Sequence, residues 1–191
     1  MTFHLHESQF ARTAVVNLLK ATIDGLANRV FAPGGPGRPG PWTRADHWIT
    51  TLTAEKRLSS HVGARVILEP ATSWMDTDAW TSGTWAYVSG PPAVWVSERE
   101  KVWRDHVTHS LSQQIDTPLE SPIETRMSFR IAAHRFDQLD LDNLAYPAVQ
   151  AIALAAFHAP RNALQIHRIT AEKARVDSRD EQGLLVGVRR L

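Results

Sequence analysis

Two aspartates and an asparagine, in the run Asp140-Leu141-Asp142-Asn143, are the residues whose types and spacing point most directly to chemistry. They stand where an apolar helical pattern begins. Two carboxylates two residues apart lie on the same side of an extended segment, and such a pair can hold a hard divalent cation through oxygen ligands. A structural interpretation also exists, because Asp and Asn are preferred around helix N-caps and acids suit the positive end of the helix dipole. The pattern alone favours the structural interpretation.

The helix that these residues open belongs to a pattern that occurs twice in the chain. Residues 17–31 read NLLKATIDGLANRVF and are followed by ITTLTAEK at 49–56, whereas residues 143–157 read NLAYPAVQAIALAAF and are followed by IHRITAEK at 166–173. The first copy is longer by nine residues, which is the length of the Pro/Gly-rich stretch 32–40. This ordered match predicts an internal duplication. Two copies favour a pseudo-symmetric pair, by analogy with a twofold dimer.

The hydropathy pattern predicts an α+β fold in which each copy reads strand, helix, strand, strand. In the first copy we expect a strand over 2–6, a helix over 14–30, an exposed loop over 32–41, and strands over 48–56 and 64–69. In the second we expect a strand over 123–133, a helix over 142–157, and strands near 164–173 and 184–190. Strict alternation over 123–133 predicts a half-buried strand. Ser97 and Glu100 form the pattern of a capping box, which predicts a helix start there.

This pattern divides the chain into three stretches. Residues 1–69 form a truncated copy and residues 94–191 a fuller copy. In the second copy, an extra hairpin and helix come before the strand-helix-strand-strand unit. Between them, residues 70–93 are rich in Ser, Thr, Gly and Pro but also hold three tryptophans and a tyrosine. A disordered linker rarely carries so many aromatic residues, so we expect an ordered hairpin or docked arm there.

Composition places the chain among ordinary globular proteins. It has 191 residues, of which 43% are hydrophobic and 21% charged, and it has no run apolar enough to span a bilayer. The absence of cysteine excludes disulfides and thiolate metal sites, and it fits a cytoplasmic location. A net charge of +1 gives no global attraction to nucleic acid, so any such binding needs a local patch. Lysine is scarce, yet Lys20, Lys56 and Lys173 all fall in the repeated pattern.

Four runs occur in order in the second copy: VWVSEREKVWRDHVTHSLSQQ from residue 94, the strand IETRMSFRIAA, LDLDNLAYPAVQAI and RITAEK. With these runs the chain resembles the RusA family of Holliday junction resolvases. The resemblance covers nearly a full family unit in 94–191 and the C-terminal part of a unit in 1–69. The resemblance implies a small endonuclease that uses Mg²⁺ (or Mn²⁺) and cuts four-way DNA junctions as a dimer. By this resemblance, the chain looks like such a dimer fused into one polypeptide, with its first copy truncated.

Departures from the family pattern are complementary between the copies. In the second copy Asp140 and Asp142 match the paired acids of the family, but Tyr146 replaces its lysine and Ala163 its third acid. In the first copy Ala14 and Val16 replace the paired acids, while Lys20 matches the lysine and Asp46 the third acid. The two copies together hold one full set.

The resemblance therefore implies one composite catalytic site built from Asp140, Asp142, Lys20 and Asp46, with Asp140, Asp142 and Asp46 as the metal ligands. The leading hypothesis is an endonuclease acting on branched or structured DNA. The alternative is a DNA- or protein-binding module that kept the fold and lost catalysis. For either we expect no membrane partner, and a further homodimer of the pseudo-dimer is possible.

Overall fold

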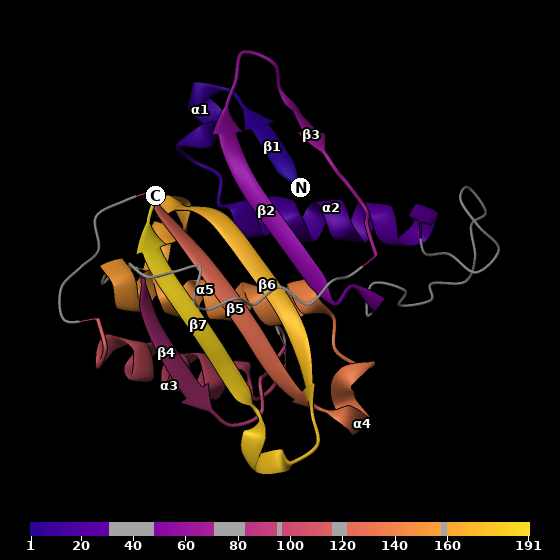
Figure 1. Cartoon of the computed structure of the whole chain (residues 1–191). Coiled ribbons are helices and arrows are strands. Elements are labelled where there is room, and N and C mark those ends of the chain that lie inside the picture. The colour runs from indigo at the N-terminus through magenta and orange to yellow at the C-terminus, as the bar shows by residue number, and fades with distance from the viewer. Residues whose placement is uncertain (31–47, 71–82, 95–96, 116–121, 158–159) are drawn as a thin grey trace.

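A seven-stranded mixed sheet forms the frame of the molecule, in the order β3-β1-β2-β6-β5-β7-β4 (Figure 1). The computed structural model describes residues 1–30, 48–70, 83–94, 97–115, 122–157 and 160–191. The strands are β1 (Thr2–Leu5), β2 (Thr51–Leu58), β3 (Gly63–Arg65), β4 (Thr84–Ser89), β5 (Ile123–Ala132), β6 (Ile166–Val176) and β7 (Gly183–Arg190). The loop expected at 32–41 and residues 71–82 of the connector expected at 70–93 lie outside the described residues.

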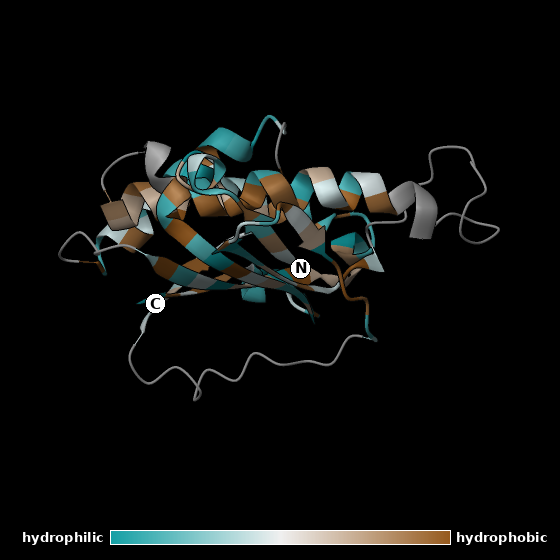
Figure 2. Cartoon of the chain, turned by 90° about the horizontal axis from the view of Figure 1, so that it is seen from above, coloured by the Kyte–Doolittle hydropathy of each residue, from teal (hydrophilic) through white to brown (hydrophobic). Residues whose placement is uncertain are grey.

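Helices cover one face of this sheet, as Figure 2 shows. They are α1 (Glu7–Phe10), α2 (Val15–Val30), α3 (Glu100–Ser112), α4 (Ala133–Phe136) and α5 (Leu141–Phe157), with 3₁₀ turns at Pro160–Gln165 and Arg179–Glu181. The central helix α5 contacts both α2 and α3, which explains why it is apolar on nearly all sides. Among the described residues, no helix combines the length and apolar character needed to cross a bilayer.

The two halves of the sheet have the same connectivity. Residues 1–70, the first half, run β1-α1-α2-β2-β3, and residues 122–191, the second half, run β5-α4-α5-β6-β7. In each half the first strand is central, parallel to the second strand and antiparallel to the third. Registers also correspond, because Phe3 lies opposite Lys56 and Phe129 lies opposite Lys173.

The halves meet along the antiparallel pair β2–β6. Thr53 lies opposite Thr170, and these two threonines occupy the same place in the repeated Thr-Ala-Glu-Lys pattern. This register is the one expected if a local twofold axis relates the two halves. Helices α2 and α5 lie against one another on the covered face, as expected for the two repeated helices.

The second half carries two additional elements at its outer side. Strand β4 pairs antiparallel with β7, and α3 packs on α5 and contacts β4. In the first half, β3 is the edge of the sheet, with no further strand beside it among the described residues.

Two local predictions are wrong. Helix α3 begins at Glu100 with Arg99 as N-cap and no side-chain cap hydrogen bond, so Ser97 does not cap it. Strand β5 is buried on both faces rather than one. Its Glu124 can be buried because arginines of the neighbouring strands β6 and β7 pair with it.

Candidate functional site

Lys20 of the first half meets Asp142 of the second half where α2 crosses the start of α5. The Lys20 Nζ donates to Asp142 Oδ2 at 3.1 Å and to Asn143 Oδ1 at 3.0 Å. A weaker contact joins the same ammonium to Asp24 at 3.5 Å. The Asp142 side chain is only 2% exposed, and that of Lys20 is 22% exposed. The pair is therefore largely desolvated, which strengthens its electrostatic attraction.

Asp140 joins this group through Asn143. The Asn143 Nδ2 donates to Asp140 Oδ2 at 3.0 Å, so one amide links the Lys20 ammonium to the Asp140 carboxylate. Asn143 was not among the predicted site residues. Its place in the Asp-x-Asp-Asn run, with Asn17 at the equivalent position of the first copy, is the signal that could have found it.

The electrostatics of the cluster hold Lys20 in its charged form. Burial of the Lys20 ammonium acts to lower its pKa, but the charge and hydrogen bond of Asp142, with a smaller contribution from Asp24, raise the pKa above its usual value. Lys20 is therefore a fixed cation at neutral pH, beside a buried carboxylate. Such a cation can offset negative charge on a bound phosphate.

A buried lysine in each half holds the segment that leads into the long helix. Lys173 Nζ donates to the carbonyls of Leu139 at 2.9 Å and Phe136 at 3.2 Å. Leu139 immediately precedes Asp140, so this lysine fixes the backbone that carries the two acids.

Lys56 makes the corresponding contacts in the first half, to the carbonyls of Phe10 at 2.9 Å and Thr13 at 3.1 Å. It also donates to Leu164 of the second half at 2.7 Å. Each ammonium lies over the ring of the phenylalanine it contacts, Phe10 or Phe136. Burial lowers the pKa of Lys56 to about 8.

The oxygen ligands of this cluster suit a hard cation such as Mg²⁺ only if ligands from outside the protein complete its coordination shell. Asp140 and Asp142 supply carboxylate oxygens, and Mg²⁺ is often bound by one or two carboxylates, with waters and substrate phosphates completing its shell. Over the described ranges, no three His, Cys, Asp or Glu side chains group as they would in an all-protein metal site. Asp46, the third predicted ligand, lies outside the described residues.

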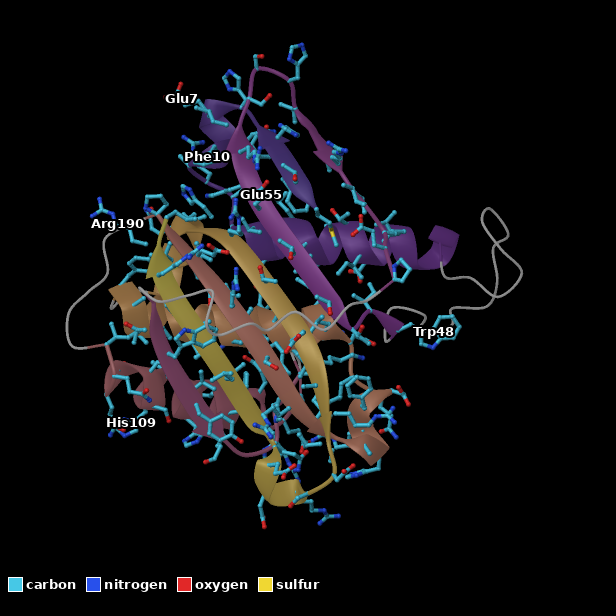
Figure 3. The ribbon with its side chains drawn as sticks, in the orientation of Figure 1. Glu7, Phe10, Trp48, Glu55, His109 and Arg190 are labelled. Carbon is cyan, nitrogen blue, oxygen red and sulfur yellow. The ribbon has the colours of Figure 1, made fainter. Side chains whose placement is uncertain are left out.

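The sheet face opposite the helices carries a row of charges that the sequence analysis did not predict. Arg189, Glu124, Arg168 and Glu55 are register neighbours on four adjacent strands. Arg168 donates to Glu55 at 2.7 Å and Arg189 donates to Glu124 at 2.9 Å. Burial alone would raise the pKa of Glu55, but hydrogen bonding from Arg168, together with Arg57, lowers it. Figure 3 shows Glu55 on β2.

The twofold relation breaks down at Glu172, which occupies the place of Glu55 in the second copy. Ser128 donates to Glu172 at 2.8 Å, as Thr2 donates to Glu55 at 3.3 Å. Thr51, however, lies opposite Glu172 where Arg168 lies opposite Glu55. Burial raises the pKa of Glu172, against the opposing effect of the Ser128 hydrogen bond.

Comparison with known proteins adds no assignment. No protein-family model matches the chain, and no curated protein matches it.

Proposed function

We propose that the chain is a duplicated RusA-like pseudo-dimer that acts as a metal-dependent endonuclease on branched DNA through one composite site. The observation that carries the proposal is the contact between Lys20 and Asp142 at 3.1 Å. These residues are 122 positions apart in the chain. Each belongs to the copy that retains the corresponding family residue, and the fold brings them into hydrogen-bonding distance.

The duplication part of the proposal is supported by matched contacts in the two halves. The pairs Lys56–Phe10 and Lys173–Phe136 are equivalent in position and in kind. So are the hydrogen bonds Thr2–Glu55 and Ser128–Glu172. Independent segments would rarely share connectivity, register and side-chain contacts together, whereas two copies of one unit inherit all three.

Roles for the residues follow from their placement. Asp140 and Asp142, with Asp46, would hold the cation, which when bound supplies an activated water and stabilises charge on the scissile phosphate. Lys20 offers an ammonium to the phosphate beside them. Asn143 holds the Asp140 carboxylate in place, and Lys173 holds the backbone that leads into it.

The test is cleavage of a synthetic four-way DNA junction in Mg²⁺ or Mn²⁺. We expect Asp142→Asn to abolish cleavage because it removes a ligand charge and weakens the hold on Lys20. The matched control is Asp24→Asn, which removes the exposed, weaker partner of Lys20 at 3.5 Å and should leave cleavage nearly unchanged. Equal activity of all three proteins would refute the site, and lack of any cleavage by the wild type would refute the nuclease.

One observation favours the second candidate, a binding module without catalysis. Asp142 is nearly inaccessible and its charge is already compensated by Lys20. Such a pair can serve as a structural link between α2 and α5. A binding module would bind junction DNA or a protein equally well with Asp142→Asn, in the presence of EDTA, and without any cleavage.

A further inference from the structure

The ammonium group of Lys20 lies among side-chain oxygens of the kind that bind hard cations. Its Nζ is 3.0 Å from Asn143 Oδ1, 3.1 Å from Asp142 Oδ2 and 3.5 Å from Asp24 Oδ1. Carboxylate and amide oxygens are also the ligands that Mg²⁺ and Ca²⁺ take in proteins. Lys20 therefore supplies the positive charge that a divalent cation bound to Asp142 would also supply.

The amide of Asn143 is held with its oxygen toward the ammonium. Its Nδ2 donates to Asp140 Oδ2 at 3.0 Å, so its Oδ1 is the atom that accepts from Lys20 at 3.0 Å. Asp142 Oδ2 and Asn143 Oδ1 thus converge on one point, and Lys20 Nζ occupies that point. Both oxygens become available to another cation only when Lys20 leaves.

Lys20 and a divalent cation cannot share Asp142. The Asp142 side chain is 2% exposed, so little water is near it to screen charge. Like charges a few ångströms apart repel strongly in such a place. A buried carboxylate left alone is also costly, so Lys20 leaves Asp142 readily only if a second cation takes over its charge. The two cations therefore compete for one carboxylate.

The ammonium has an open side on which it can be drawn away. The Lys20 side chain is 22% exposed, and that of Asp24, one turn further along α2, is 54% exposed. A phosphate that reaches the site from solvent offers the ammonium charged acceptor oxygens. The lysine side chain is flexible enough to turn toward them. A bound phosphate thus relieves the competition at Asp142.

We infer that Lys20 couples cation binding to phosphate binding at the proposed site. Its ammonium covers Asp142 and Asn143 until a phosphate of the DNA backbone takes it, and the two oxygens are then available to the divalent cation. This inference rests on the proposed nuclease function and adds a regulation of that site. Cation binding is weak without DNA, and by reciprocity the cation and the DNA strengthen each other's binding by the same factor.

NMR signals of the lysine ammonium groups test the competition without any cleavage. The signals are few, because the chain has only the lysines Lys20, Lys56, Lys101 and Lys173. When Mg²⁺ is titrated into the full-length protein without DNA, the Lys20 signal should shift and its protons should exchange faster with water. The amides of Asp142 and Asn143 should shift in parallel. The signals of Lys56 and Lys173 are internal controls and should stay unchanged, because main-chain carbonyls hold both.

Two results of this titration separate the inference from the proposed function. Shifts at Asp142 and Asn143 with an unchanged Lys20 signal would overturn the inference and leave the metal site standing. If neither residue shifts at any Mg²⁺ concentration, the metal site is wrong and the inference fails with it. The titration uses the wild type, so its result does not depend on whether a variant at Lys20 folds.

Mn²⁺ affinity measures the strength of the competition. In the absence of DNA, Lys20→Met should bind Mn²⁺ about tenfold more tightly than the wild type, a factor typical of coupled sites. Electron paramagnetic resonance of the free ion gives both dissociation constants. Asp24→Asn is the matched control, because it leaves the Lys20–Asp142 pair in place and should bind as the wild type does. Adding Asp142→Asn to Lys20→Met should abolish the gain, and equal affinity of Lys20→Met and wild type would overturn the inference.

The coupling to phosphate is measured by binding of a four-way DNA junction in EDTA and in Ca²⁺, which takes the same oxygen ligands as Mg²⁺. Gel electrophoresis checks that the junction stays intact. Ca²⁺ should strengthen junction binding about tenfold more in the wild type than in Lys20→Met, because only the wild type has an ammonium to release to the phosphate. The same strengthening in both proteins would show that Lys20 does not couple the two ligands.

Discussion

The contact between Lys20 and Asp142 has no charged counterpart at the equivalent positions of the other copy. At the equivalent positions of the other copy stand Tyr146 and Val16, so the same pair of positions is ionic on one side of the axis and without charge on the other. A largely buried ion pair is costly to break by removing one partner, because the remaining charge is left desolvated. Replacing both partners by apolar residues is often nearly neutral.

A stability prediction follows for these two residues. Lys20→Met should lower the free energy of unfolding by about 2–3 kcal/mol, because the 2% exposed Asp142 loses its cation. The double variant Lys20→Tyr/Asp142→Val, which copies the residues of the equivalent positions, should recover most of that loss. Urea denaturation of the single and double variants measures the coupling. A double variant as unstable as Lys20→Met would show that the pair contributes through separate contacts.

Some side-chain contacts could be predicted from the sequence and others could not. The complementary losses around Lys20 and Asp142 predicted that these two side chains lie together, because the resemblance placed both in one set of residues. The repeated pattern also drew attention to Lys56 and Lys173. It could not reveal that their partners are main-chain carbonyls. Every residue has such a carbonyl, so residue types do not show which ones a lysine contacts. Asn143 was missed because its amide bridges two groups that only the fold brings together.

Periodicity and the repeated pattern predict the helices and most of the strands. They do not predict which faces of these elements are buried. The strand predicted over 123–133 is present as β5, but alternation wrongly indicated one solvent-facing side. Its charged face is buried because arginines from β6 and β7 neutralise Glu124. Such pairing depends on strand order, which local pattern does not encode. The start of α3 was also predicted wrongly. The residue types of a capping box do not by themselves show which residue begins the helix, and α3 begins at Glu100.

Glu172 provides a test of the register between β2 and β6. Because burial raises its pKa in the folded state, the folded protein holds this proton to higher pH than the unfolded chain does. The contribution of this proton to the free energy of unfolding is fully present below the usual glutamate pKa of 4.5. It is lost as the pH rises through the raised pKa of Glu172. Thr51→Arg should supply the cation that Arg168 supplies to Glu55, and stabilise the protein at pH 7 by about 1 kcal/mol.

The control for this prediction is Thr51→Gln, which adds length without charge and should give little gain at pH 7. The advantage of Thr51→Arg should shrink as the pH falls towards 3, because protonation of Glu172 removes the charge with which the arginine pairs. Chemical denaturation of the three proteins at pH 3, 5 and 7 measures both effects. A gain that persists unchanged at pH 3 would mean that the arginine acts through packing, and that Glu172 is not its partner.

At the scale of the whole molecule, one continuous sheet joins two halves with equivalent registers, and only one side of the axis carries the paired acids. The shared connectivity of the two halves could be predicted from the sequence because the repeated runs kept their order. The pairing of Thr53 with Thr170 could not, because it is set by how the halves pack.

A single composite site has a kinetic consequence that a symmetric dimer would not share. If the protein cuts DNA, one molecule engages one strand at a time, because Asp140 and Asp142 lie on one side of the axis and Ala14 and Val16 occupy the equivalent positions. On a supercoiled plasmid with an extruded cruciform, the first product should be a nicked circle. Linear product should appear later, through rebinding.

An excess of unlabelled junction added after binding should suppress that linear product while leaving the first nick unchanged, because it captures each released molecule before it can bind again. The assay is interpretable at concentrations where sedimentation shows a monomer, since a further homodimer would bring two sites together. Linear product formed directly, from one bound monomer and in the presence of the competitor, would mean that a second cutting site exists in the chain. The catalytic set would then have to be sought outside the cluster around Lys20 and Asp142.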